Sequence, residues 1–480
     1  MEWYRNEKAA VVEALRRGER PDLATTMASG SLDELVALHQ DLGIFAILDE
    51  LEVQRARAGL PDELLLRTLA TLPFVEQASL SGATEVLFRE PAVLVQLGWA
   101  PVQIRSGSNG RHRHPDGRQE ESLPCHPDTL RDALRRVGES AWLQAQAAGV
   151  QSLYQRQLVR GKVYAVDGSG LGEDLRLVAL VCVSATRPII VAWRLLSGPA
   201  SEKGQEATVT RSLIEQVLEM AGPQAISLLL ADALYADGPL LAWLKYRKGI
   251  DALVSLPEDR LLYQDLQGLA DGQLIDWTPH RYLRTIGGHK QVREVEVTAT
   301  AELTSWDSFL EAAARSGAPD ASLWACLIRD VTTPELAQEL PRALVSTRRF
   351  SDGFAALQAF RPRWHIEDDT YRELKEGWGL EKQHWGRDLA AAVGRTTLTC
   401  LAFNTAQVYR LRAGEHLAVM AIRRLRRRRQ RELGSAPAVI YLAGCYGVFA
   451  LEELLSLLGT PARESLLPDL PKSSSTDAPT

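Results

Sequence analysis

Between residues 160 and 257, short apolar runs rich in β-branched residues alternate with longer amphipathic segments. The runs have strand length and are bounded by turn-forming residues, whereas the longer segments repeat with helical periodicity. The predicted strands span residues 162–167, 176–184, 189–196, 225–231 and 252–256, and the predicted helices span residues 205–221 and 239–248. The order strand, strand, strand, helix, strand, helix, strand is typical of an α/β fold with a mixed sheet and crossover helices.

Outside this region the pattern changes twice. Leu35, Leu38, Leu42 and Phe45 recur at three- and four-residue spacing and predict a separate helical domain near the N-terminus. After residue 257 strand-like pieces predict a β-rich insertion, before the core resumes with a strand and a helix. The predicted organisation is a helical N-terminal domain that could bind DNA (1–155), the first part of the core (160–257), the insertion (258–340), the second part of the core (341–412), a helical C-terminal region (413–470) and a disordered tail (471–480).

Composition limits the possible classes of protein. The chain has 480 residues, enough for two or three domains, and a formal net charge of −6. This balance argues against a protein that coats nucleic acid uniformly, so any DNA contact would come from local basic patches. Candidates are the seven arginines within residues 423–431 and the helix containing Arg131. A solvated helix end is an equal alternative for the arginine run, and a solvated face on a packing helix is the favoured reading for the Arg131 helix.

The cysteines and the apolar runs indicate a cytoplasmic location. Five cysteines lie far apart and include no CxxC pair, which favours a reducing compartment. The first residues lack the apolar core of a signal peptide. The apolar run at residues 436–451 is too short to span a bilayer. We therefore expect no membrane association.

Two aspartates follow apolar strands. Asp167 belongs to a Val-Asp-Gly-Ser-Gly segment, and Asp232 follows four apolar residues and precedes Tyr235 by three positions. Acids at the carboxyl ends of strands stand where α/β folds place their sites. A hairpin turn at Asp167 and a helix cap at Asp232 are the alternative readings.

A third acid lies on a predicted helix together with basic residues. Glu367 is flanked by Arg363, Arg372 and Lys375, a mixture that suits a site for metal and phosphate. Two aspartates and a glutamate supply the hard oxygen ligands that Mg²⁺ prefers, and a pair of such ions can activate water for phosphodiester cleavage. The alternative is a surface of intrahelical salt bridges. Aromatic residues at sevenfold spacing argue for a docked helix and against that alternative; they are Trp364, Tyr371, Trp378 and Trp385.

Together these segments resemble the DDE transposases of bacterial insertion sequences. The resemblance is to the group with the signature tyrosine, two residues, arginine, three residues, glutamate, six residues, lysine, and it covers about residues 160–410. It implies a ribonuclease-H-like core with a β-rich insertion ahead of the glutamate helix. Asp167, Asp232 and Glu367 would be the catalytic, metal-holding acids. The residues expected at DNA are Arg363, Arg372, Lys375 and Tyr235.

The chain departs from the signature at two positions. Phe360 stands at the tyrosine position, which keeps the ring and loses the hydroxyl. Lys375 comes one residue late and would be rotated away from Glu367 on a regular helix. Either a local bulge restores the common face, or Arg372 makes the phosphate contact instead.

The resemblance implies cut-and-paste transposition with Mg²⁺, for which Mn²⁺ could substitute. The expected partners are double-stranded DNA, at the element ends and the target, and a second copy of the chain in a homodimer on DNA. Two other functions stay open. One is a transposase-derived DNA-binding protein that no longer cuts; the other is a different hydrolase, such as a glycosidase with a carboxylate pair.

Overall fold

The computed structural model describes residues 5–27, 32–55, 59–75, 77, 79–100, 103–104, 123–172, 174–184, 187–201, 206–286, 289–381, 388–412, 424–425, 428, 437–450, 453–454 and 456–457. The chain divides into two units, one formed by Met1–Ser152 with Leu374–Thr480 and the other by Leu153–Glu373. Residues 374–412, which the sequence analysis assigns to the core, thus belong with the N-terminal unit.

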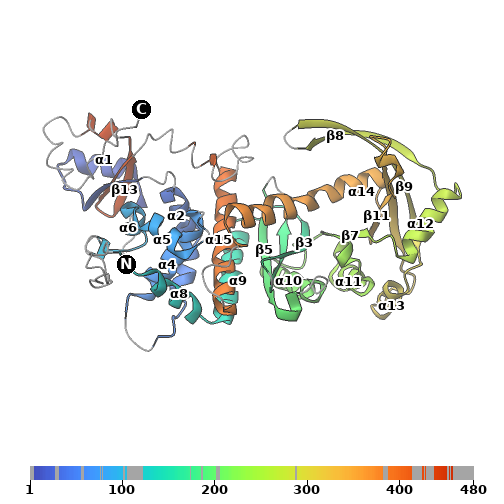
Figure 1. Cartoon of the computed structure of the whole chain (residues 1–480), viewed down its shortest axis with the longest axis horizontal. Coiled ribbons are helices and arrows are strands. Elements are labelled where there is room, and N and C mark those ends of the chain that lie inside the picture. Colours follow the sequence, from blue (N-terminus) through green and yellow to red (C-terminus); the bar gives the residue numbers. More distant parts are fainter. Residues whose placement is uncertain are drawn as a thin grey trace, which may run out of the picture. The chain divides into compact units, whose positions relative to one another are not determined.

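The unit of residues 153–373 contains the alternating strands and helices (Figure 1). Its first elements are β3 (Val163–Gly170), β4 (Leu175–Cys182), β5 (Ile189–Ser197), η2 (Gly198–Ser201), α10 (Glu206–Ala221), β6 (Leu228–Ala231), η3 (Ala233–Tyr235), α11 (Gly238–Trp243), η4 (Leu244–Lys248) and β7 (Asp251–Leu256). This order confirms the predicted one. The strands are almost entirely buried because each consists of apolar residues on both faces.

These strands are five of the nine in a mixed sheet with the order β5-β4-β3-β6-β7-β11-β10-β9-β8. β3, β4 and β5 pair antiparallel through short turns. β6 and β7 continue the sheet parallel to β3, as the crossover helices require. The fold is therefore mixed α/β, as predicted.

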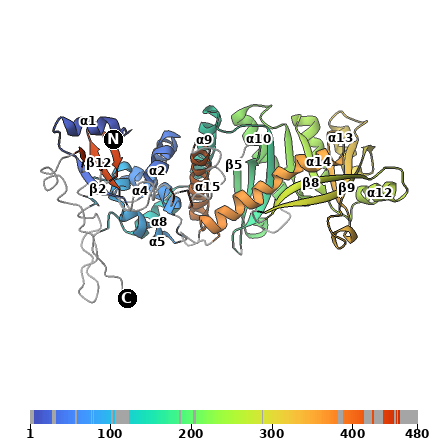
Figure 2. The same cartoon turned by 90° about the horizontal axis from the view of Figure 1, so that it is seen from above.

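The predicted insertion extends the same sheet. Its elements are α12 (Leu261–Asp271), β8 (Thr278–Ile286), β9 (His289–Leu303), α13 (Asp307–Arg315), β10 (Leu323–Asp330) and η5 (Leu336–Gln338). β11 (Arg342–Ser346) pairs antiparallel with both β7 and β10 and so joins the added strands to the core. The long hairpin of β8 and β9 lies at the edge of the sheet, beside the helix that begins with α14 (Figure 2).

The helix with the third acid is irregular. It begins as α14 (Gly353–Phe360), where the Asp352 side chain caps the Ala355 N–H. A 3₁₀ turn, η6 (Arg361–Arg363), follows at Pro362. Two π-helical stretches come next, η7 (Ile366–Tyr371) and η8 (Glu373–Gly377). A π turn closes i→i+5 hydrogen bonds and so accommodates an extra residue.

The other unit is mainly helical in its described part. Its helices are α1 (Lys8–Arg16), α2 (Leu32–Asp41), α3 (Ile44–Asp49), α4 (Asp62–Thr71), η1 (Leu72–Val75), α5 (Leu80–Phe88), α6 (Pro91–Gln96), α8 (Pro127–Arg136), α9 (Glu139–Gln155, which runs on into the other unit) and α15 (Leu389–Arg412). α15 is buried along nearly its whole length. Among its buried polar residues, Thr405 contacts His39 Nδ1 at 2.7 Å, through Oγ1.

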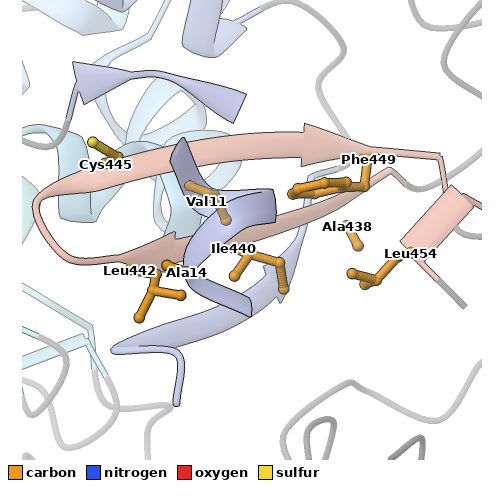
Figure 3. Packing of buried hydrophobic residues seen from close by; sticks show 8 residues of the cluster. All are labelled: Val11, Ala14, Ala438, Ile440, Leu442, Cys445, Phe449 and Leu454. Carbon is orange, nitrogen blue, oxygen red and sulfur yellow. The ribbon is translucent and has the colours of Figure 1, made fainter. Parts of the chain in front are cut away.

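The two ends of this unit meet in a four-stranded sheet of order β1-β13-β12-β2, formed by β1 (Arg5–Asn6), β2 (Leu23–Thr26), β12 (Ala438–Leu442) and β13 (Cys445–Phe449). α1 packs on it, and Val11 and Ala14 contact Ile440 and Phe449 in one apolar cluster (Figure 3). The prediction of a helical C-terminal region is therefore wrong for residues 438–449. A run of apolar residues does not distinguish a buried strand from a buried helix, and the strands that pair with it come from the other end of the chain.

Some predicted features lie outside the described residues or remain ordinary surface. Most of the arginine run at 423–431, Trp385 and the predicted tail at 471–480 are outside. Arg131, on α8, forms an ion pair with Asp128, which agrees with a solvated helix face. Within the described part of the chain, each helix is too short or too polar to cross a membrane.

Candidate functional site

The two strand-end aspartates are brought together by the pairing of β3 with β6. The last partners of this parallel ladder are Val166 and Ala231, so Asp167 and Asp232 are the next residues on neighbouring strands. Asp232 ends its strand as predicted. Asp167 does not, because β3 continues to Gly170 along β4. What ends at Asp167 is the pairing with β6, and this brings the two aspartates side by side.

Each aspartate also makes a local hydrogen bond. Asp232 caps the short turn η3, accepting a hydrogen bond from the Leu234 N–H at 2.9 Å through Oδ1. The cap reading of this residue is thus correct, but it occupies only one carboxylate oxygen. Asp167 Oδ1 accepts from the Gly168 N–H at 2.8 Å. Asp167 is 9% exposed, so its charge is largely removed from water.

The helix with Glu367 packs against β3 through η6 and η7. Arg363 Nη1 lies 2.6 Å from Glu367 Oε1, one helical turn away. The Arg363 side chain is only 5% exposed, whereas that of Glu367 is 36% exposed. A buried guanidinium therefore lies at this helix, and its charge acts on both aspartates.

The charges of Glu367 and Arg363 affect the pKa values of both aspartates. Burial, followed by the charge of Asp232, raises the pKa of Asp167 to about 7; Glu367 also raises it, while the Gly168 hydrogen bond and Arg363 lower it. Burial likewise raises the pKa of Asp232, again with Arg363 opposing and Glu367 adding to the rise. Carboxylates that repel each other in a dry environment are stabilised by a nearby cation. Arg363 supplies part of that positive charge.

The donor chemistry of the aspartate pair fits a divalent cation. Asp167 and Asp232 offer neighbouring hard oxygen donors whose repulsion and burial a bound Mg²⁺ would relieve. The Glu367 carboxylate forms an ion pair with Arg363. Among the described residues no three histidine, cysteine, aspartate or glutamate side chains converge as a metal-holding group. The pair therefore fits a metal ion, and Glu367 could act as third ligand only by exchanging Arg363 for the metal.

Sequence reasoning missed a fourth acid beside this pair. Glu206, the first residue of α10, is 1% exposed and pairs with Arg176 at 2.9 Å. Its charge also raises the pKa of Asp232. A Cβ on Gly168 would stand 2.3 Å from Glu206 Cγ. The glycine thus makes room for Glu206, while Gly170 has open space around it.

The residues expected at DNA occupy different environments. Tyr235 is 1% exposed, and its hydroxyl has no hydrogen-bond partner in the described part of the chain. Tyr235 is therefore a buried side chain that lies near the acids. Arg363 is buried as well. Arg372 is exposed and pairs with Asp368 at 3.3 Å, and Lys375 belongs to the other unit.

The Glu367 helix combines the two alternatives that the sequence leaves open, a surface of intrahelical ion pairs and a face docked on the rest of the protein. Ion pairs at i,i+4 spacing, such as Arg372–Asp368 and His365–Asp369, do line it. Tyr371 and Trp378 are buried, as a docked helix requires, but Trp364 is 38% exposed, against the prediction. π turns lie between Glu367 and Lys375, which is the kind of bulge that an extra residue in the spacing demands.

Phe360 keeps the packing role of a ring without the hydroxyl. It is 1% exposed, and the guanidinium groups of Arg342 and Arg363 lie 4.8 and 5.6 Å from its ring centroid. Cation–π contacts of this kind hold the arginines in place. The phenylalanine thus still orients Arg363.

Comparison with models of protein families and with curated protein sequences finds no match.

Proposed function

We propose that the chain is a DDE transposase that cleaves DNA and joins the cut end to a target with the help of Mg²⁺ or Mn²⁺. The observation that carries the proposal is the parallel register of β3 and β6, which sets Asp167 beside Asp232. The helix with Glu367 packs on β3, so all three acids come from one part of the fold.

The sheet supports the finer fold assignment. The first five strands have the order β5-β4-β3-β6-β7, with only the second strand of the chain order antiparallel to the others. This is the arrangement of a ribonuclease-H-like core. We assign that core to residues 163–256 together with the helix of Glu367.

The residues divide the chemistry between them. A bound divalent metal ion would activate a water molecule and neutralise charge on the leaving oxygen. Asp167 and Asp232 would hold it, and Glu367 would join them on leaving Arg363. Arg363 would then be available to the charge of the scissile phosphate, and exposed Arg372 to a neighbouring phosphate. The freed 3′ hydroxyl would attack a target phosphodiester in line, forming a new P–O bond while the P–O bond to the target strand's 3′ oxygen breaks and that strand leaves with a 3′ hydroxyl.

A nicking assay on supercoiled plasmid DNA tests the proposal. The intact chain should nick the plasmid with Mg²⁺ or Mn²⁺ and not in EDTA. Asp167→Asn, Asp232→Asn and Glu367→Gln should each lower the rate by more than about 100-fold, because losing an inner ligand costs more than losing an outer-shell partner. Glu215→Gln is the matched control. Glu215 lies on α10, and its carboxylate forms an ion pair with Lys248 outside the candidate site.

One observation favours a second candidate, a transposase-derived protein that binds DNA without cutting it. Glu367 is paired with Arg363, and the three acids do not converge in the described structure. This candidate predicts that plasmid binding is retained, that no nicking occurs with either metal, and that Glu367→Gln changes neither.

A further inference from the structure

Tyr371 connects the helix of the third acid to the strand of the first. It is the last residue of η7, four positions after Glu367, and is 4% exposed. Its side chain reaches the backbone of the sheet. Tyrosine can make such a contact because its ring is rigid and its hydroxyl both donates and accepts hydrogen bonds.

The hydroxyl meets three backbone groups of β3 and β4. It accepts a hydrogen bond from the Ala179 N–H at 3.1 Å and lies 2.5 Å from the Asp167 carbonyl oxygen and 3.2 Å from that of Leu177. Asp167 and Ala179 are direct partners in the antiparallel ladder. The hydroxyl is therefore bound at the very register position that carries the first acid.

We infer that Tyr371 is a positioning residue that fixes the Glu367 helix against the Asp167 strand. The inference rests on the proposed function for its catalytic consequence, but the anchor itself is a feature of the fold. Glu367 lies on the same π-helical stretch as Tyr371, a rare backbone form that is frequent at functional sites. A hydrogen bond from the same stretch to the Asp167 carbonyl sets the separation of the two acids.

The test removes only the hydroxyl. Tyr371→Phe keeps the buried ring. The matched control is Tyr263→Phe, because Tyr263 is 2% exposed and its hydroxyl also donates to a backbone carbonyl, that of Pro341 at 2.8 Å. Both variants lose buried hydrogen bonds between a tyrosine hydroxyl and the backbone of the same unit. Only Tyr371→Phe loses a contact to β3, the strand that carries Asp167.

Hydrogen–deuterium exchange measures the anchor without any activity. In Tyr371→Phe, exchange should rise at least tenfold at residues 366–373 and at the Ala179 amide, while Tyr263→Phe leaves both segments as in the unaltered chain. Incorporating p-aminophenylalanine at position 371, which restores a donor, should restore the protection. Unchanged exchange in Tyr371→Phe, or an equal rise in Tyr263→Phe, would overturn the inference.

Plasmid nicking then measures the consequence. Tyr371→Phe should nick at least tenfold more slowly and need more Mn²⁺ for half-maximal rate, with unaltered plasmid binding, whereas Tyr263→Phe should match the unaltered chain. A rise in exchange without loss of nicking would refute the positioning role. If the unaltered chain does not nick DNA at all, the proposed function fails, and the exchange result still decides the anchor.

Discussion

The aspartates and the glutamate of the site are held by different kinds of structure. Asp167 and Asp232 are adjacent because the backbone ladder of β3 and β6 aligns them. Glu367 depends on side chains, namely the ion pair with Arg363 and the hydrogen bonds of Tyr371. A ladder of many hydrogen bonds fixes its residues rigidly, whereas a few side-chain contacts can exchange. The first two acids are thus a fixed platform, and the third is an adjustable arm.

The aspartates of the fixed platform should make the stability of the metal-free chain depend on pH. The folded chain holds the Asp167 proton up to about pH 7, far above the ordinary pKa of 3.8. The metal-free chain should therefore lose stability as pH rises from about 4 to 7, by on the order of 2–4 kcal/mol. Asp167→Asn should remove most of this loss in urea unfolding with EDTA.

Asp251→Asn, at the start of β7, is the control and should keep the pH dependence of the unaltered chain. The platform account is contradicted if Asp167→Asn unfolds with the same pH dependence as Asp251→Asn.

The adjustable arm should respond to loss of its cation. Arg363→Met keeps the buried stem but removes the charge that faces Glu367 and both aspartates. We expect a loss of about 2 kcal/mol at pH 8, less than for a fully buried pair because Glu367 is partly exposed. Mg²⁺ should recover part of this loss. Equal stability of Arg363→Met and the unaltered chain in EDTA would show that Arg363 does not compensate the acids.

Two glycines of β3 test how tightly the platform is packed. Gly168→Ala places a Cβ against Glu206 and should cost about 1–3 kcal/mol in urea unfolding. Gly170→Ala, two residues along the same strand with open space around it, should change stability by less than about 0.5 kcal/mol. Similar losses in the two variants would mean that the packing of Glu206 over Gly168 is not what requires a glycine.

The platform was predictable from the sequence, whereas the arm was predictable only in part. Apolar runs followed by Asp167 and Asp232 are local patterns, and parallel strands bring such ends together. The contacts of Tyr371 and Glu206 depend on tertiary packing that no local pattern reports. The terminal sheet was missed for the same reason, since Arg5 pairs with Cys445. The spacing to Lys375 left a local bulge as one of two alternatives, and the π turns are an irregularity of that kind.

Crystals of the chain soaked in Mn²⁺ show whether Asp167 and Asp232 hold a metal ion together. Anomalous scattering should place manganese between the Asp167 and Asp232 carboxylates, with Glu367 turned from Arg363 toward the metal. The same experiment on Asp232→Asn should lose that peak. Well-ordered carboxylates with no manganese between them, at a concentration that supports nicking, would contradict the account.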